Sequence, residues 1–152
     1  MSDAAASPPS GGPWYRRGLR FRCLGVECGD CCSGKHGTGH VWVDEAEIEA
    51  LARHLGLAVD DFTRRHVRLV GRRLALVEKP NLDCIFYEAG RGCTVYEARP
   101  RQCRAYPFWP DLLKTPRAWE AEKACCPGIE AEGAEIVDRA AIRGLLRIRS
   151  RP

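Results

Sequence analysis

The clearest pattern of apolar and polar positions lies between Asp44 and Gly56. Apolar side chains recur there at the three- and four-residue spacing of one helical face, at Ile48, Leu51 and Leu55. Asp44 precedes them and Glu47 stands three residues later, which is the arrangement of a capping box. Gly56 occupies the place where many helices end in a left-handed residue. The pattern therefore predicts a helix between Asp44 and Gly56.

Shorter patterns predict further elements on both sides of this helix. Residues 61–70 are expected to form a short helix capped by Asp60 or Asp61, and residues 41–43 and 73–78 to form strands, the second closed by Pro80. The segment from about residue 135 to residue 149 carries apolar residues at helical spacing and is expected to be a helix.

Two short apolar runs, residues 84–87 and 93–96, flank the glycine-containing sequence EAGRG. Such a pair predicts a hairpin of two strands, with Cys84 and Cys93 at the strand starts. Ten prolines and fifteen glycines indicate many turns and few long elements. We therefore expect an α+β fold: a small single domain with short hairpin strands and a few helices, organised around a cysteine-bound metal or iron–sulfur centre.

The first 13 residues are rich in Ala, Ser, Pro and Gly, and Trp14 and Tyr15 bring the first aromatic side chains. This composition predicts a disordered tail over residues 1–13 and one domain over residues 14–150. The tail has no apolar core of a secretory signal, and no apolar run is long enough to cross a bilayer. We expect the protein in the reducing cytoplasm, without membrane association, where clustered cysteines more often bind metals than form disulfides.

Nine cysteines in 152 residues need a chemical explanation, because exposed free thiols oxidise and cross-link. Four of them crowd into one early segment, at Cys23, Cys28, Cys31 and Cys32. The gaps of four and two residues match the loop of plant-type two-iron ferredoxins, and two thiolates separated by two residues can reach one centre. The spacing predicts a metal or cluster site.

The number of cysteines suits two four-thiolate sites, or one site with spare thiols. Side chains of adjacent residues tend to diverge, so Cys31 and Cys32 are expected to serve two centres, or one is expected to bind while the other packs. The same applies to Cys125 and Cys126. The formal net charge of +4 would be offset by the negative charge of such thiolate sites.

Four motifs in a fixed order carry a family resemblance: Phe21-Arg-Cys23 with Cys28-Gly-Asp-Cys31-Cys32, then Cys84-Ile-Phe, then the stretch from Cys93 to Pro107, and finally Cys126-Pro-Gly-Ile129. Together they resemble the YkgJ-type cysteine-cluster family, described as a zinc- or iron-chelating domain, over residues 21–130. The first gap has four residues here instead of the usual two, and Cys125 has no counterpart in the motif.

The resemblance implies a chelating role, and the ligands we infer are Cys23, Cys28, Cys31, Cys32, Cys84, Cys93, Cys103 and Cys126. Arg99 and Arg104 flank Cys103 within the motif, and we expect them to offset thiolate charge from outside the ligand set. Tyr96 and Tyr106 are expected to pack around the site. His36 and His40 are weaker ligand candidates, because the cysteines already suffice.

The leading functional hypothesis is a protein that binds an iron–sulfur cluster or iron through thiolates, with a redox, sensing or cluster-handling role and a redox or client protein as partner. The alternative is a structural zinc module that acts as an adaptor without enzymatic activity. No Cys–His–acid arrangement or phosphate-binding loop indicates a particular reaction. The arginine-rich residues 139–151 are interpreted as an amphipathic helix with a solvated face, so nucleic-acid binding is not favoured.

Overall fold

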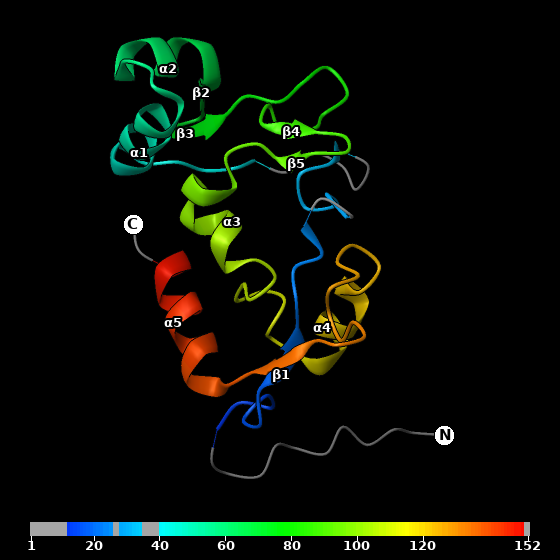
Figure 1. Cartoon of the computed structure of the whole chain (residues 1–152). Coiled ribbons are helices and arrows are strands. Elements are labelled where there is room, and N and C mark those ends of the chain that lie inside the picture. Colours follow the sequence, from blue (N-terminus) through cyan, green and yellow to red (C-terminus); the bar gives the residue numbers. More distant parts are fainter. Residues whose placement is uncertain (1–11, 26–27, 35–39, 151–152) are drawn as a thin grey trace.

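The computed structural model describes residues 12–25, 28–34 and 40–150. Most of the tail predicted over residues 1–13, and His36, lie outside these residues. Within them the strands form three separate two-stranded antiparallel sheets, accompanied by helices (Figure 1). The prediction of a small α+β fold is confirmed at this level.

The helix predicted after Asp44 is α1, Glu45–Leu55. Its capping box is complete, because Asp44 accepts from the amide of Glu47 and the Glu47 carboxylate accepts from the amide of Asp44. Gly56 ends it with φ 68°, in the left-handed region that glycine adopts without strain. Ile48 and Leu51 are buried as expected, whereas Leu55 is exposed in the last turn.

The next predicted helix ends earlier than expected. α2 spans Val59–His66, and the chain then continues directly into β2, Val67–Val70, which pairs with β3, Arg73–Leu76. Residues 67–70 were predicted as helix, but Val67 and Val70 are β-branched and Gly71, with φ 61°, closes a hairpin after them. The strand predicted at residues 41–43 is a single bridge from Trp42 to Ala75.

The hairpin predicted around EAGRG exists but is shorter than expected. β4 is Tyr87–Glu88 and β5 is Gly92–Cys93. The prediction that the cysteines start the strands is wrong: Cys84 precedes β4 and bridges to Glu78, and Cys93 ends β5. After β5 come a 3-10 turn, η3 (Tyr96–Ala98), and a short helix, α3 (Arg101–Ala105), which carries Cys103.

The remaining elements are a strand near the start of the described chain and the elements that follow α3. β1, Leu19–Phe21, pairs with β6, Glu135–Val137. Residues 135–137 are therefore a strand, whereas the helix expected from about residue 135 to residue 149 was predicted to begin there. The terminal helix α5 spans Arg139–Ser150. α4, Pro116–Glu122, begins after Thr115, whose hydroxyl caps the amide of Ala118, and Pro116 suits the first helical turn.

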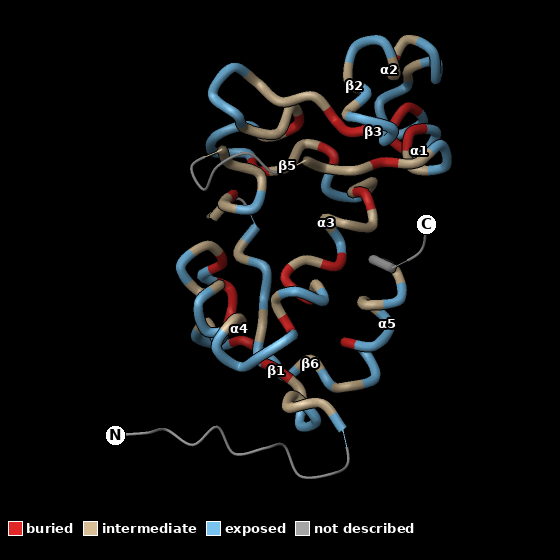
Figure 2. The backbone as a smooth tube through the Cα atoms, turned by 180° about the vertical axis from the view of Figure 1, so that it is seen from behind, coloured by how far each residue is buried: buried red, intermediate tan, exposed pale blue. Residues whose placement is uncertain are grey.

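Buried residues fall into two separate cores, and Figure 2 marks the buried parts of the chain in red. The first core lies among α1, α2, β3 and the β4–β5 hairpin, and its largest fully buried residues are Phe62 and Leu51. The second core lies among β1, α4 and α5 and centres on Trp119, Phe108 and Ile142. Cys84 and Cys93 pack against the first core, whereas Cys126 belongs to the second. The cysteines thus come from both halves of the molecule.

Candidate metal centre

A cavity of about 730 Å³ is lined by all nine cysteines. Val41, Leu76 and the hairpin cysteines contribute the wall that belongs to the first core, and Phe21, Tyr106 and Cys126 contribute the wall that belongs to the second. The structure therefore brings all eight predicted ligands together, along with Cys125. Cysteines separated by most of the sequence line one space.

Four cysteines form the first thiol group, which we define as Cys32, Cys84, Cys93 and Cys103. The amide of Cys84 donates a 2.8 Å hydrogen bond to the carbonyl of Cys32, and the amide of Gly34 donates one of 2.7 Å to the Asp83 carboxylate. These two bonds hold the early cysteine segment against the segment that precedes the hairpin. The thiols of Cys32 and Cys93 are hydrogen-bonded to each other.

Cys126 approaches the cavity from the side of the second core. Cys126 follows α4, and its amide donates to the carbonyl of Glu122. The amide of Arg22 donates a 3.1 Å bond to the carbonyl of Gly128, which places the chain leading to Cys23 beside the Cys126 turn. A Cβ at Gly128 would overlap that segment of chain, so only glycine permits the close approach.

Cys31 and Cys32 do not diverge as expected from adjacent residues. Their sulfurs are 4.0 Å apart. Zn–S bonds of about 2.3 Å in a tetrahedron place two sulfurs roughly 3.8 Å apart. Sulfurs at this separation can therefore ligate one ion or two adjacent ions.

Charge is distributed unequally over the thiols. Hydrogen bonding with Cys32 lowers the pKa of Cys31 to about 7 and that of Cys93 to about 6. The positive charge of Arg99 acts in the same direction on both. The pKa of Cys32 rises instead, because its hydrogen bonds with these two neighbours and its burial favour the protonated thiol.

Burial has the opposite effect on the more enclosed thiols. It raises the pKa of Cys84, and it raises that of Cys103, where the neighbouring charges of Cys84, Cys31 and Cys93 add to the shift. The pKa of Cys126 rises to about 11 through burial, against the lowering effect of two backbone amides. These thiols would be protonated near neutral pH without a cation, and a bound metal ion would displace those protons.

A repeated local arrangement presents backbone amides to the sulfurs. In four separate turns the thiol accepts a hydrogen bond from the amide two residues later; these pairs are Cys28 with Asp30, Cys84 with Phe86, Cys93 with Val95, and Cys126 with Gly128. An N–H donor stabilises a thiolate, which is the form that binds metal. The four turns are therefore preorganised for thiolate ligation.

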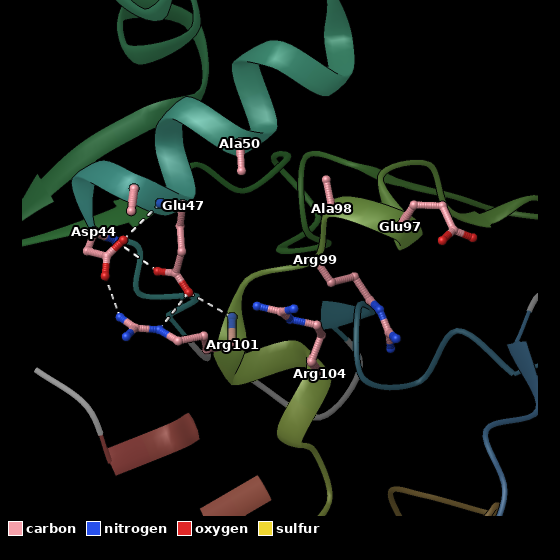
Figure 3. Close-up of a pocket in the computed structure, with 9 residues that line it drawn as sticks. Asp44, Glu47, Ala50, Glu97, Ala98, Arg99, Arg101 and Arg104 are labelled. Atoms are coloured by element: carbon pink, nitrogen blue, oxygen red, sulfur yellow. Dashed lines mark hydrogen bonds and ion pairs between the residues drawn. The ribbon is translucent and has the colours of Figure 1, made fainter. Parts of the chain in front are cut away.

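The two arginines of the predicted charge-balancing pair occupy different surroundings. Arg99 lies with its guanidinium 3.7 Å over the ring of Tyr96, and its charge acts on Cys31, Cys93 and Cys103. Arg104 lines the cavity. Both arginines also line a neighbouring pocket of about 300 Å³ (Figure 3).

In that neighbouring pocket Arg101 joins α1 to α3. Its guanidinium binds the carboxylates of Asp44 and Glu47, and its amide donates a 2.7 Å bond to Glu47 (Figure 3). The same two residues form the capping box of α1. This connection fixes the start of the helix that carries Cys103.

Glu78 and Glu122 line the cavity and were not anticipated there from the sequence. Glu78 lines the cavity near Cys84 and binds Arg68 through two oxygens, at 3.0 and 2.9 Å. Tyr106 packs beside Cys126 as expected, and its hydroxyl donates a 2.5 Å bond to Glu122. His40 contacts Arg68 and Glu78 and does not line the cavity.

The donor set suits a thiophilic metal, because the thiols share one cavity and several are predisposed to ionise. Among the described residues, no group of three or more Cys, His, Asp or Glu side chains is arranged closely enough to hold a metal ion. The cavity is wider than a closed four-ligand site. The residues therefore fit a metal group by chemistry and by their common enclosure.

Such a fold and site define a small thiolate metal-binding domain. Residues 22–131 match the CxxCxxCC family, described as a zinc- or iron-chelating domain. The chain belongs to this family, which confirms the resemblance seen in the sequence. No solved structure gives a significant match to the chain. Among the described residues, α-helices all fall short of the length and hydrophobicity that a membrane span requires.

Proposed function

We propose that this protein binds iron through its thiolates, as an iron–sulfur cluster or as iron, and that the bound centre has a redox, sensing or cluster-handling role. One observation carries the proposal: nine cysteines line one cavity of about 730 Å³. A closed site for a single zinc ion is filled by its own four ligands. The number of thiols and the volume together support a larger, polynuclear group.

The ligands would come from the eight predicted cysteines, and Cys125 would remain as a ninth thiol in the wall. An iron–sulfur group supplies one-electron chemistry when it is bound. The chain itself supplies the amide donors of four turns and the charge of Arg99, which stabilise negative charge on sulfur. Hydrogen bonds to the sulfurs and nearby charge tune the reduction potential of such a centre.

Part of the cavity wall is apolar. Phe21, Val41 and Leu76 line the cavity together with the thiols. In a site of low polarity, the amides and Arg99 act more strongly on the sulfurs than they would in water. The chain thereby strengthens the stabilisation of negative charge on the sulfurs.

Exchange with a partner requires an accessible edge. Cys23 and Cys31 are exposed residues, whereas Cys126 is buried. We propose that a redox or client protein approaches at the exposed edge, and that the protein acts in the reducing cytoplasm, where free thiols persist.

The test is purification of the full chain without oxygen, followed by determination of iron, acid-labile sulfide and zinc. The proposal expects iron and sulfide, with visible absorption and a paramagnetic signal on reduction. Cys93→Ser should lower the iron content, whereas the matched Cys125→Ser change should leave most of it. Colourless protein that contains zinc and takes up no iron on anaerobic reconstitution would overturn the proposal.

A structural zinc module is the second candidate. The 4.0 Å separation of the Cys31 and Cys32 sulfurs favours it, since this is close to the edge of a zinc–thiolate tetrahedron, about 3.8 Å. Such a centre would stabilise the fold without redox activity. The same elemental determination separates the two candidates.

A further inference from the structure

Two segments of the chain carry the positive charge of the protein. Residues 12–25 and 139–150 contain four arginines each, and neither segment contains a lysine, an aspartate or a glutamate. The whole chain has 24 Lys and Arg and 20 Asp and Glu, so the 16 basic residues outside the two segments are outnumbered by acidic ones. The net charge of +4 therefore arises from these two segments alone.

The fold places the two segments side by side (Figure 1). β1 pairs with β6, and β6 leads through Asp138 into α5. A Cβ at Gly18 would lie 2.5 Å from the carbonyl oxygen of Val137, and a Cβ at Gly12 would lie 3.4 Å from the guanidinium of Arg139. The turn before β1 is thus packed against the beginning of α5, and arginines from distant parts of the sequence share one region of the molecule.

Most of these arginines are open to solvent. Six of them are exposed and Arg139 is half-buried. Among the described residues, no ion pair joins them to a carboxylate. Asp138, which lies between β6 and α5, uses its carboxylate to accept from the amide of Ala141. We define the arginine surface as Arg16, Arg17, Arg20, Arg22, Arg139, Arg143 and Arg147.

The arginines on α5 are placed unfavourably for the helix itself. Arg139, Arg143 and Arg147 follow at four-residue spacing along one side, while Ile142 is buried in the second core. Like charges at this spacing repel each other, and Arg139 stands in the first turn, where the helix dipole favours acidic residues. Contacts within the helix therefore do not account for the three arginines, whereas an acidic partner would relieve their repulsion.

The arginine surface reaches the edge of the cavity that the cysteines line. Arg22 and Cys23 both line this cavity, and Cys23 is exposed. α5 packs against α3, which carries Cys103. A molecule bound to the arginine surface would therefore lie beside the exposed edge of the site.

The aromatic side chains of this region do not favour a nucleic acid as the partner. Proteins that bind single strands stack bases on aromatic rings along a basic groove. Trp14, Tyr15 and Phe21 instead pack against the second core, and the Trp14 indole donates a 2.8 Å hydrogen bond to the carbonyl of Leu113. The carboxylates of a protein require only the charge and the planar donors of the guanidiniums.

We propose that the arginine surface is the docking surface for an acidic protein, which its charge directs to the exposed edge of the cavity. The inference rests on the proposed function, to which it adds the surface and the chemistry of the partner. Complementary charge increases the rate of association and selects the partner more than it increases affinity. Docking is therefore expected to be transient and sensitive to salt.

The experiment measures the binding of two labelled probes to the full chain by fluorescence anisotropy. One probe is a helical peptide with a glutamate at every fourth position, and the other is an oligothymidylate with the same number of charges. The peptide should bind more tightly than the oligonucleotide. A rise in salt from about 50 to about 200 mM should weaken peptide binding about tenfold.

Paired charge reversals show whether the two segments act as one surface. Each pair should weaken peptide binding about tenfold or more: Arg16→Glu with Arg17→Glu before β1, and Arg143→Glu with Arg147→Glu on α5.

The matched control is Arg65→Glu with Arg72→Glu, which reverses the same charge at exposed residues of α2 and of the turn between β2 and β3. This pair should weaken binding less than about threefold. Far-ultraviolet circular dichroism shows whether each variant is folded, and the corresponding Arg→Gln pair replaces a variant that is not.

The proposal is overturned if the wild-type chain does not bind the peptide, or if salt leaves that binding unchanged. Equal or tighter binding of the oligonucleotide would overturn the assignment to an acidic protein. An equal loss in the control, or a loss in only one of the two test pairs, would overturn the assignment to this surface.

Iron determined in the same anaerobic preparations separates this inference from the proposed function. All variants should keep the iron content of the wild type. Iron in a wild-type chain that does not bind the peptide would overturn the docking surface alone. A chain that takes up no iron would overturn the proposed function, whatever the peptide does.

Discussion

The amide of Cys84 donates a 2.8 Å hydrogen bond to the carbonyl of Cys32, which joins the early cysteine cluster to the segment before the β4–β5 hairpin. The bond holds two ligand candidates from distant parts of the sequence in one group without the help of a metal ion. Because the bond lies in the backbone, it does not depend on the ionisation of either thiol. Ligand preorganisation of this kind lowers the cost of ordering the chain on binding.

Cys93 and Cys31 should be the most reactive thiols of the metal-free protein near pH 7. The pKa of Cys93 is lowered to about 6 and that of Cys31 to about 7, so at pH 7 Cys93 is mostly thiolate and Cys31 about half, whereas Cys103, with its raised pKa, stays protonated. Alkylation at Cys93 should fall as the pH drops through about 6. Mass spectrometry of peptides after brief iodoacetamide treatment, from pH 5 to pH 9, measures this.

The depressed pKa values also have a consequence for stability. A group whose pKa is lower in the folded chain than in the unfolded chain stabilises the fold fully above its unfolded pKa, here 9, and this contribution is lost as the pH falls from there through the folded pKa of about 6 for Cys93 or about 7 for Cys31. Cys32→Ala removes the shared hydrogen-bond partner and should raise the pKa of both neighbours toward 9. Equal alkylation profiles in wild type and variant would contradict the role given to Cys32.

Arg99→Gln should weaken metal binding about tenfold, in the range known for changes just outside a ligand set. Arg99 acts on the charge of three thiols, so its loss removes positive charge where the thiolates gather. Arg104→Gln is the matched control, since Arg104 lines the same cavity and its change removes the same charge. Competition with a chromophoric chelator gives both affinities. Equal losses in the two variants would contradict a specific role for Arg99.

Gly29→Ala should destabilise the protein by more than the about 1–2 kcal/mol cost of a left-handed residue. Gly29 has φ 64°, and a Cβ there would overlap the ring of Tyr87 on β4. Gly71→Ala is the control, because Gly71 has φ 61° with open space around the added atom. Denaturant unfolding of both variants measures the difference, which should favour Gly71→Ala. A similar loss in both would show that the contact with Tyr87 yields readily.

Arg101→Ala should lower the free energy of unfolding by about 1–3 kcal/mol, because it leaves the mostly buried carboxylate of Glu47 without its charged partner. Arg64→Ala, which breaks an exposed pair with Asp61 on α2, should change stability by less than about 0.5 kcal/mol. Thermal unfolding of the two variants gives the comparison. If Arg101→Ala also displaces Cys103 on α3, the metal content of this variant should fall. The metal content of Arg64→Ala should stay unchanged.

Local signals predicted the elements that local chemistry determines. The capping box from Asp44 and the left-handed Gly56 fixed α1, and the glycines of EAGRG fixed a hairpin. Leu55 kept the helical spacing but is exposed, because it lies in the last turn, beyond the reach of the first core. β6 could not be distinguished from helix by spacing alone, since its partner β1 lies at the other end of the described chain.

The sequence predicted most of the cysteines that line the cavity, and it did not predict how they are arranged there. All eight predicted cysteines line the cavity, and so does Cys125, which has no counterpart in the family motif. Their grouping depends on tertiary contacts, such as the bond from Cys84 to Cys32, that no spacing encodes. Adjacent residues were expected to diverge, yet the Cys31 and Cys32 sulfurs are 4.0 Å apart because that short segment turns tightly after Gly29.

The two cores are built from different parts of the chain. Buried residues of the first core fall in one continuous stretch, from Val43 to Val95, whereas the second is built from Leu19 and from residues beyond Phe108. During synthesis the first stretch can therefore collapse while the ribosome is still adding the second. Cys126 emerges after every other inferred ligand, so the thiol lining of the cavity is completed only once the chain beyond Phe108 has been synthesised.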